Sequence, residues 1–544
     1  MTRLLPTSMY ETADERPRST DLPGFARAEA PSLVVGGLVG LYFLVVRLRL
    51  PWESDFALHM AVLGRLLTNP LHPGDPVLAI GGTSAYYTPY TVVLMLIGKA
   101  TGASALSLYK FAAIVNVGLL LTGLFRFVRS LSPARWAPPL ALVGLLFWWG
   151  TTVIAWSGFL SLVSFADTVA YPSTFATALT LHLWASLAAK PLRMRRAIAL
   201  GFLLGVIALS HQFTAIGTLI GVVACLIARR GTILRGTQAN AESNIEKPDA
   251  DASRGASYRR VLTVGAPFYV GAAVCLIVIA AWPYYHLWNI TQVDQLSALD
   301  GQHHALYRHA TAWYGFGLLA LIALALRFLR DKTDQLVLLF LGTGAIVAYG
   351  AVSGHWSYGR SWPMAMLAAQ VALAIAAAEA RTPRLRVAWD VPIALITAAG
   401  VWVQSSALLY VVPSSLKSSA SRIVDTSQKK DPLPTLDWLG AHVKRGDVVL
   451  ADRPTAQDMV AAHGGYGVAS PWILPDFPFS LWTSRRDAVA RFFASDATPA
   501  AHADLLTRYD VKWILLGPGE NLPADVTATF SAGDNLGYRL YRVG

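Results

Sequence analysis

The stretch WESDFALHMAVLGRLL, residues 52–67, decides the fold because it joins a membrane-length apolar run to a cluster of acids. The run before it, at about residues 32–50, has the ~20 residues that a helix needs to cross a hydrocarbon core. Glu53 and Asp55 follow directly, and His59 comes one helical turn after Asp55, on the same face. Two interpretations of Asp55 stay open at this point. It is an N-cap for the next helix, or it is a catalytic acid at the membrane surface.

The composition places this stretch in a polytopic membrane protein. The chain has 544 residues, of which 54% are hydrophobic and 14% charged, whereas soluble proteins carry roughly a quarter charged residues. This excludes the collagenous, disordered, disulfide-rich and purely soluble classes. The net charge of +12 comes from short loops between apolar runs, which indicates membrane orientation and no nucleic-acid partner.

Apolar runs of spanning length recur along the chain and predict about eleven transmembrane helices. After the first, at about 32–50, the sequence predicts spans at about 105–127, 137–155, 172–188, 197–210, 212–228, 262–283, 312–329, 335–352, 362–380 and 391–412. Residues 54–69 and TPYTVVLMLIGKATG (88–102) are assigned to two helices on the outer membrane surface, because the second is too short to span comfortably.

The distribution of Lys and Arg supports this topology. With a cytoplasmic N-terminus, the five inner loops (126–135, 190–196, 229–260, 327–332 and 381–386) carry 20 basic residues, and the outer loops before the last span carry 4. Making 88–102 a span would put the basic clusters outside, against the positive-inside rule. The inner loop 229–260 is polar, and its middle is predicted to be disordered.

Soluble segments flank the predicted membrane domain, which covers residues 33–412. Residues 1–32 are predicted to form a flexible cytoplasmic tail. Residues 413–544 have ordinary soluble composition and alternate helix-like segments with strand-like ones, such as DVVLA (447–451) and VKWILLG (511–517). We expect a small α/β domain on the extracytoplasmic side, given the odd number of spans.

Polar residues gather near the predicted outer ends of the spans. Tyr87 and Tyr90 in SAYYTPYT (84–91) are interface anchors or substrate contacts. Lys110, at the outer start of a span, snorkels to headgroups by default but is also a candidate phosphate ligand. DGQHHALYRHATAWY (300–314) contains His303, His304 and Arg308 without a standard ligand spacing. Anion binding is therefore favoured over a metal site there.

Three further positions belong to the same outer level. In SGHWSYGRSWP (353–363), Arg360 has the planar donor fork that suits phosphate, with His355 and Tyr358 beside it. A snorkelled Arg is the alternative. His211 lies at a tight turn between two predicted spans, and Asp167 lies upstream of another. Each has a structural and a substrate-binding interpretation that the sequence does not separate.

The order of these elements resembles the GT-C superfamily of membrane glycosyltransferases. In that superfamily the first outer loop holds two surface helices, and the first opens with an Asp-containing motif and ends near an Arg. ESDFALHMAVLGRLL is similar, with Asp55 in the position of the catalytic acid and Arg65 near the end. AYYTPYTVVLMLIGKATG is similar to the second, and LYKFAAIV with Lys110 to the span that follows. Many members have an Asp-Glu pair, so Glu53 stays an alternative to Asp55.

The resemblance implies an integral protein of a bacterial-type plasma membrane that moves a sugar from a polyprenyl-phosphate donor. The acceptor is a hydroxyl of a glycan, lipid or protein on the outer face, and membrane lipids are further partners. Asp55 is expected to act as base with inversion. No cofactor is expected, and a divalent metal stays an alternative that no motif supports. Cations near the right level are candidates for the donor phosphate: Arg360, Lys110, Arg308, His303, His304 and His355. Candidates for other substrate contacts are His59, Tyr87, Tyr90, Asp167, His211 and Tyr358.

Two other classes of protein compete with this hypothesis. A transporter or flippase for a lipid-linked sugar is expected to carry ionisable residues near the bilayer midplane and often to show repeated halves. The sequence shows almost none of the former and no visible repeat. A non-catalytic anchor that presents the C-terminal domain seldom needs eleven spans with polar clusters at one level. Glycosyl transfer is therefore favoured.

Overall fold

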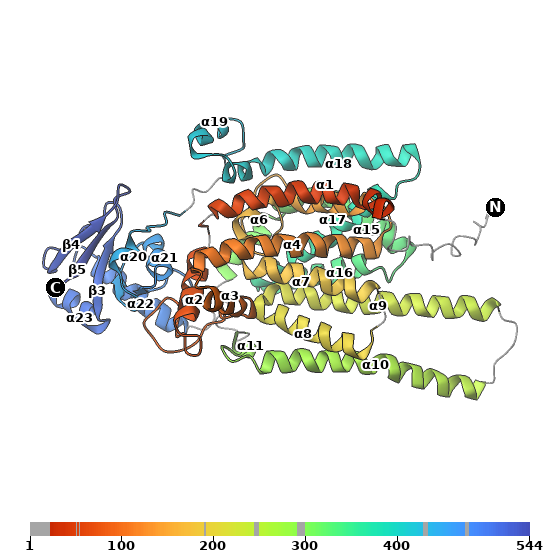
Figure 1. The fold of residues 1–544 in the computed structure, drawn as a ribbon, viewed down its shortest axis with the longest axis horizontal. Helices are drawn as coiled ribbons and strands as arrows, with labels where there is room; N and C mark the ends of the chain where they lie inside the picture. Colours follow the sequence, from red (N-terminus) through yellow and green to blue (C-terminus); the bar gives the residue numbers. More distant parts are fainter. Residues whose placement is uncertain are drawn as a thin grey trace.

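A helical bundle carries a small α/β domain at one end (Figure 1). The computed structural model describes residues 22–50, 52–53, 55–189, 192–243, 250–290, 300–427, 433–473 and 478–544. The tail predicted for residues 1–32 therefore lies largely outside the described residues. Helix α1 (Leu22–Val46) runs from the far end of the bundle to the end that carries the C-terminal domain.

Each predicted span coincides with a helix. Among the described residues, seven helical segments are long and apolar enough to cross a membrane, and the count of eleven spans stays a prediction. The helices at the predicted spans are α1, α4 (Ala105–Leu131), α5 (Ala137–Phe147), α7 (Pro172–Ala189), α8 (Met194–Ser210), α9 (Gln212–Ser243), α10 (Ala250–Ala280), α15 (Leu318–Arg330), α16 (Gln335–Ser353), α17 (Trp362–Ala378) and α18 (Pro383–Val403).

Short helical segments connect them at the ends of the bundle. They are η1 (Arg47–Arg49), α6 (Leu162–Thr168), α11 (Leu287–Ile290), α13 (Ala305–Arg308), α14 (Ala310–Tyr314), η2 (Gly315–Gly317), η3 (Trp356–Ser361), η4 (Ser405–Tyr410), η5 (Ser414–Leu416) and α19 (Lys417–Ala420).

The predicted span 137–155 is wrong in its second half, because α5 ends at Phe147. The chain leaves the helix there to pair with the backbone before α15. The N–H of Thr151 donates to the carbonyl of Ala312 at 2.7 Å, and that of Phe316 donates to Trp149 at 3.0 Å. A Cβ at Gly150 would lie 2.0 Å from the Ala312 carbonyl oxygen, so only glycine permits this approach. The released segment after Gly150 lines the candidate site.

Two other boundaries also differ from the prediction. The inner loop 229–260 is largely helical, since α9 continues to Ser243 and α10 begins at Ala250. The residues between them, where disorder was expected, lie outside the described part. Helix α18 begins at Pro383 instead of 391, because Thr382 caps it and proline suits the first turn. It ends at Val403, and the predicted last nine residues of that span leave the helix.

The two helices expected after the first span are both present. α2 (Phe56–Thr68) and α3 (Pro89–Thr101) have 13 residues each. At 1.5 Å per residue each is ~20 Å long, which is less than the ~30 Å of a hydrocarbon core. Thr88 and Thr91 form a capping box at the start of α3, and Gly102, at φ 72°, ends it. Their orientation along a membrane surface stays a prediction.

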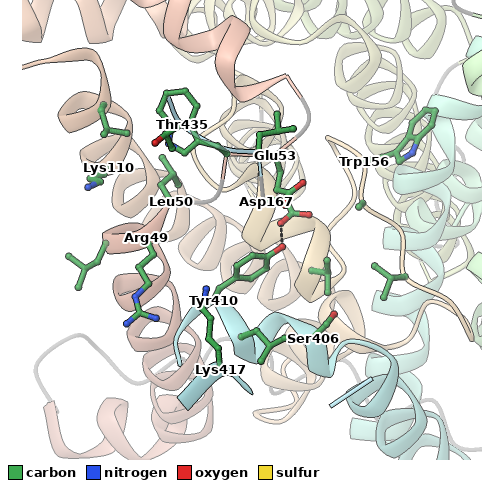
Figure 2. A pocket seen from close by; sticks show the side chains of 18 of the residues that line it. Arg49, Leu50, Glu53, Lys110, Trp156, Asp167, Ser406, Tyr410, Lys417 and Thr435 are labelled. Carbon is green, nitrogen blue, oxygen red and sulfur yellow. Dashed lines mark hydrogen bonds between the residues drawn. The ribbon is translucent and has the colours of Figure 1, made fainter. Parts of the chain in front are cut away.

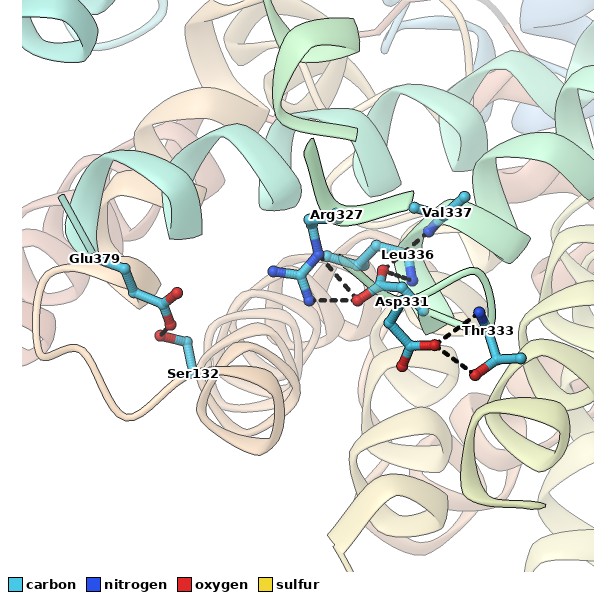
Figure 3. A network of polar contacts seen from close by, with 8 residues as sticks. Ser132, Arg327, Asp331, Thr333, Leu336, Val337 and Glu379 are labelled. Atoms are coloured by element: carbon cyan, nitrogen blue, oxygen red, sulfur yellow. Dashed lines mark hydrogen bonds and ion pairs between the residues drawn. The ribbon is translucent and has the colours of Figure 1, made fainter. Parts of the chain in front are cut away.

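A polar network fixes α15 and α16 at the end of the bundle away from the C-terminal domain (Figure 3). Asp334 caps α16 by accepting bonds from the backbone N–H groups of Leu336 and Val337 at 3.0 and 3.2 Å. Its other oxygen accepts two bonds from the Arg327 guanidinium, at 2.7 and 3.1 Å. Ser132 donates to Glu379 nearby, at 2.6 Å. The last turn of α15 is therefore tied to the first turn of α16.

The C-terminal domain is the predicted small α/β unit, built on a five-stranded sheet. The strand order is β2-β1-β3-β5-β4, with parallel pairs β2/β1 and β1/β3 and antiparallel pairs β3/β5 and β5/β4. The strands are β1 (Val448–Leu450), β2 (Tyr466–Gly467), β3 (Val511–Leu516), β4 (Ala528–Gly533) and β5 (Arg539–Val543), and the helices are α20 (Leu439–His442), α21 (Pro454–Ala462), α22 (Phe479–Phe492) and α23 (Pro499–Arg508).

The alternation of side chains along the strands gives the sheet two buried faces. Val448 and Leu450 pack with α22 and α23, whereas Val449 packs into the core that the domain shares with the bundle. Helix α21, which the sequence did not predict, covers this second face and packs against α2. The α2 helix is thus held between the bundle and the C-terminal domain.

Arg65 joins α2 to the C-terminal domain through its guanidinium. Its guanidinium donates to the carbonyls of Gly464 and Gly465 at 3.1 and 2.7 Å and lies 3.5 Å from the ring centroid of Tyr466. The N–H of Gly467 donates to the Val77 carbonyl at 2.8 Å, in the loop after α2. These contacts hold the C-terminal domain against the last turn of α2 and the loop that follows it.

Candidate functional site

Two adjoining cavities lie where α1, α2, α6 and the C-terminal domain meet. Cavity A, of about 580 Å³, lies toward the end of α1 and the segment after α18. Cavity B, of about 420 Å³, lies toward α2, the α8–α9 turn and the C-terminal domain. They share four lining residues, namely Glu53, Ala155, Trp156 and Asp167. We call these four the junction.

Cavity A is lined by cations and apolar side chains. Arg49 comes from η1, Lys110 from α4 and Lys417 from α19, and Figure 2 shows all three around the cavity. Arg49 also donates to the Val412 carbonyl. Within the described part of the chain, no carboxylate pairs with Lys110 or Lys417. The cavity wall includes Leu48, which is 59% exposed, so cavity A borders the apolar outer surface of the bundle.

The junction is acidic and almost closed to solvent. Glu53 is 8% and Asp167 is 6% exposed, and Figure 2 shows both carboxylates at the same part of cavity A. The Tyr410 hydroxyl donates to Asp167 at 2.6 Å. The Tyr171 hydroxyl donates to the backbone carbonyl of Glu53 at 2.7 Å, which fixes the chain just before α2.

Asp55 faces cavity B and does not cap α2. It occupies the N-cap position with φ −90° and ψ 18°, but its side chain makes no capping hydrogen bond. Its Oδ1 atom is buried without a hydrogen-bond partner, and its Oδ2 atom lies 3.7 Å from Nε2 of His59. The capping interpretation is therefore wrong. An unsatisfied buried carboxylate oxygen is costly and calls for a functional explanation.

His59 lies beside Asp55, one turn further along α2. It is 3% exposed and packs against the ring of Tyr171 at a centroid distance of 4.5 Å. Burial lowers its pKa, and this effect exceeds the opposite influence of Asp55. The lowered pKa favours the neutral imidazole. Arg360, which lines the same cavity, is a cation that interacts electrostatically with Asp55.

Arg360, His211 and His303 also line cavity B. The Arg360 guanidinium donates to Ser157 at 2.8 Å and lies over the rings of Trp156 and Phe213. His303 shares a hydrogen bond of 3.0 Å with Ser357. The structure thus brings Arg360 to cavity B and Lys110 to cavity A, on opposite sides of the junction.

Other predicted site residues line neither cavity. The Tyr87 and Tyr90 hydroxyls donate to the backbone carbonyls of Gly74 and Ala170, so both tyrosines serve packing. Four other residues also line neither cavity. His304 packs against Trp356, and His355 lies 3.8 Å from Asp300. Tyr358 contacts Tyr349, and Arg308 lies at the end of α13.

Sequence reasoning missed several lining residues. Arg49 carries a detectable signal, since an Arg at the outer end of the first span runs against the positive-inside rule. Tyr410 lies near the end of the last predicted span, Lys417 lies beyond it, and Trp472 lies in the C-terminal domain. No local pattern links them to the acids of the first loop. Only the tertiary fold brings them there.

The three carboxylates do not form a metal site by geometry. Glu53, Asp55 and Asp167 all line cavity B. However, nowhere in the described residues are three His, Cys, Asp or Glu side chains grouped closely enough to hold a metal ion.

Comparison with known proteins identifies the fold. No protein-family model and no curated protein matches the sequence. Among solved structures, the chain is similar to the arabinofuranosyltransferase AftD from Mycobacteria, with a TM-score of 0.54 and 14% identity over 94% of this chain and 40% of that one. An archaeal oligosaccharyltransferase from Archaeoglobus fulgidus is also similar, with a TM-score of 0.46 and 13% identity over 89% of this chain and 69% of that one.

The likeness to AftD confirms the predicted resemblance at the level of the fold. This chain shares its fold with the arabinofuranosyltransferase AftD. It spans about two fifths of the length of AftD, and at 94% of this chain the likeness extends into the C-terminal domain.

Proposed function

We propose that the protein is an integral membrane glycosyltransferase. In this proposal it transfers a sugar from a polyprenyl-phosphate donor to an acceptor hydroxyl on the extracytoplasmic face, with inversion at the anomeric carbon. The observation that carries the proposal is the partition of charge between the two cavities. Arg49, Lys110 and Lys417 line cavity A alone, and Asp55 lines cavity B alone.

The donor phosphate is assigned to cavity A. Arg49 already donates to one backbone carbonyl, and Lys110 and Lys417 pair with no carboxylate among the described residues. Such cations suit a phosphate, because charge-assisted hydrogen bonds are the strongest that a side chain offers. The apolar wall that includes Leu48 and Leu106 suits the start of a lipid chain entering from the bilayer. Three predicted phosphate ligands line neither cavity and are no longer candidates for this role: Arg308, His304 and His355.

Arg360 receives a different role from the one expected from sequence. It lies in cavity B beside Ser157 and Trp156. We therefore assign it to hydrogen bonds with the sugars and to compensation of the negative charge of Asp55. The donor sugar then lies at the junction, where Glu53 and Asp167 accept hydrogen bonds from its hydroxyls. Its anomeric carbon faces cavity B.

Asp55 acts as the general base. As the acceptor hydroxyl attacks the anomeric carbon, its proton passes to an Asp55 carboxylate oxygen. The bond between the anomeric carbon and the phosphate oxygen breaks, and the electron pair leaves with the phosphate. The cations of cavity A stabilise this added negative charge. Attack from the face opposite the leaving group inverts the configuration, so no nucleophilic carboxylate is required.

The topology completes the proposal. An N-terminus on the cytoplasmic side and eleven spans place Asp55 and the C-terminal domain outside a bacterial-type plasma membrane, in accord with the charge asymmetry of the loops. Cysteine labelling tests this in a variant with Cys225 and Cys275 replaced by Ala. Leu71→Cys and Phe530→Cys, at positions 80% and 57% exposed, should both react from outside. Opposite accessibility would contradict the topology.

Transfer itself is tested with the full chain in lipid nanodiscs. Synthetic polyprenyl-phosphate sugars of several kinds are offered with oligosaccharide acceptors, and polyprenyl phosphate release and product mass are measured. Turnover of one donor, loss of turnover in Asp55→Asn, and an inverted linkage by NMR are expected, with Arg308→Ala as an active control. Movement of the donor between leaflets without its consumption would favour the transporter alternative. Consumption of no donor would overturn the proposal.

A further inference from the structure

Cavity B is closed on one side by the C-terminal domain. Trp472 and Ile473 line it together with Asp55, His59 and Arg360. Trp472 precedes α22 in sequence, and the helix α21 beside it packs on α2 (Figure 1). A residue of the soluble domain therefore shares a wall with the carboxylate that opens the first loop.

The position of Trp472 is fixed at both its backbone and its ring. Its indole N–H donates to Asp458 at 2.7 Å, and Asp458, on α21, is 5% exposed. Ser470 accepts from the Trp472 backbone N–H at 3.2 Å and donates to its carbonyl at 2.9 Å. The indole of Trp482 bonds the Ser470 carbonyl at 3.1 Å. This is more support than an ordinary surface tryptophan has.

The fixed ring limits what the cavity can recognise. Because Asp458 occupies the only N–H of the indole, Trp472 offers its ligand an aromatic surface and no hydrogen bond. Cavity B also offers charged and hydrogen-bonding side chains, with Asp55, His211 and Arg360 among its lining residues. A ligand that matches both has one apolar face and a rim of hydroxyl groups. A sugar ring has this character, because its axial C–H groups pack on aromatic rings while its hydroxyls bond to polar side chains.

We propose that Trp472 is the stacking platform for the acceptor sugar and that Asp458 is its positioning residue. The proposal rests on the proposed function, and it commits the acceptor to a carbohydrate. A peptide or lipid acceptor is an outcome that overturns it. Asp458 does not line the cavity, and it acts only through the orientation of the ring.

Binding and turnover are both measured on the full chain in nanodiscs. The probes are linear hexasaccharides of arabinofuranose, mannose and glucose, followed by saturation-transfer NMR. KM for the saccharide is measured separately from Kd for polyprenyl phosphate. Trp472→Ala should raise saccharide KM at least tenfold and leave polyprenyl-phosphate Kd unchanged. Asp458→Asn, which keeps an acceptor oxygen for the indole, should stay within about threefold of wild type. Asp458→Leu, which lacks one, should resemble Trp472→Ala.

Trp438 gives the matched control. It is a half-buried tryptophan of the same domain whose indole N–H bonds Asp534 at 3.2 Å, and it lines neither cavity. Trp438→Ala should leave saccharide KM unchanged. Equal effects of the two tryptophan variants, or a parallel loss of polyprenyl-phosphate binding, would reduce Trp472 to a structural role and overturn the proposal. Failure of the wild-type chain to bind any of the saccharides would also overturn the proposal. If the wild type consumes the donor and Trp472→Ala has an unaltered KM for the saccharide, only the role of Trp472 as a platform is overturned. If the wild type consumes no donor, the proposed function is overturned.

Discussion

The hydroxyl of Tyr410 donates a hydrogen bond of 2.6 Å to Asp167 across 243 positions of sequence. This contact ties the segment after α18 to α6, at the junction of the two cavities (Figure 2). The same segment supplies Lys417 to cavity A. The segment after α18 connects the bundle to the C-terminal domain, and it also lines cavity A.

Tyr410→Phe should lower turnover about tenfold without unfolding the protein. Hydrogen bonds to charged groups contribute roughly 1.5–3 kcal/mol, and 1.4 kcal/mol corresponds to a factor of ten. Tyr42→Phe is the control, because its hydroxyl bonds the Ala407 carbonyl at 2.8 Å and lines neither cavity. Steady-state rates with saturating donor compare the two. Equal losses would mean that the Tyr410 bond has no special role at the junction.

Asp55→Asn should reduce turnover by ~10² or more, the usual contribution of a general base. Because Asp55 makes no capping bond to α2, the variant should melt within a few degrees of wild type. Single-turnover rates and thermal unfolding are measured together. If Asp55→Asn keeps its rate and Glu53→Gln loses it, the base is Glu53. If both keep it, neither carboxylate performs the proton transfer.

Removal of a cation from cavity A should weaken binding of polyprenyl phosphate about ten- to a hundredfold, by the same energies. Lys110→Ala and Lys417→Ala test this, because neither ammonium pairs with a carboxylate in the described residues. Arg360→Ala should leave polyprenyl-phosphate Kd within about threefold and lower turnover instead, since Arg360 lies in cavity B. The reverse pattern would restore Arg360 as the phosphate ligand.

The sequence was sufficient to predict the positions of the helices but not their ends at the site. Apolar length and the clusters of Lys and Arg located a helix at every predicted span, because both signals are local. The end of α5 at Phe147 was not predictable, since it depends on backbone pairing of Thr151 with Ala312. A run of apolar residues continues past that point and carries no sign of the pairing.

The candidate site divides in the same way. Asp55, Glu53 and His59 lie within nine residues of the end of a membrane-length run, so their pattern was visible from sequence. Asp458 and Trp472 meet them only because α21 packs on α2. Tyr87 and Tyr90 looked like substrate contacts, but the fold uses their hydroxyls to satisfy buried carbonyls.

Asp334→Ala should destabilise the bundle by about 2–4 kcal/mol, because it removes an N-cap and one partner of the Arg327 ion pair together (Figure 3). Asp334→Asn keeps the side-chain acceptor for the cap and should lose less. Thermal unfolding in nanodiscs ranks the variants. An Asn variant as unstable as the Ala variant would show that the charge, and not the cap, carries the stabilisation.

Asp458 should make the stability of the C-terminal domain fall as the pH rises from about 4 to about 8. Burial raises the pKa of this carboxyl to about 7, and the charge of Asp55 acts in the same direction. The folded state therefore holds a proton that the unfolded state releases near its ordinary pKa, so folding is favoured below that value and loses this advantage as the pH passes about 7. A shift of about three units corresponds to roughly 4 kcal/mol. Asp458→Asn does not titrate and keeps an acceptor for the Trp472 indole. Hydrogen exchange of α21 at pH 5 and pH 8 measures the difference. The wild type should lose protection between the two values relative to the Asn variant, and identical pH profiles would show that Asp458 is ionised throughout.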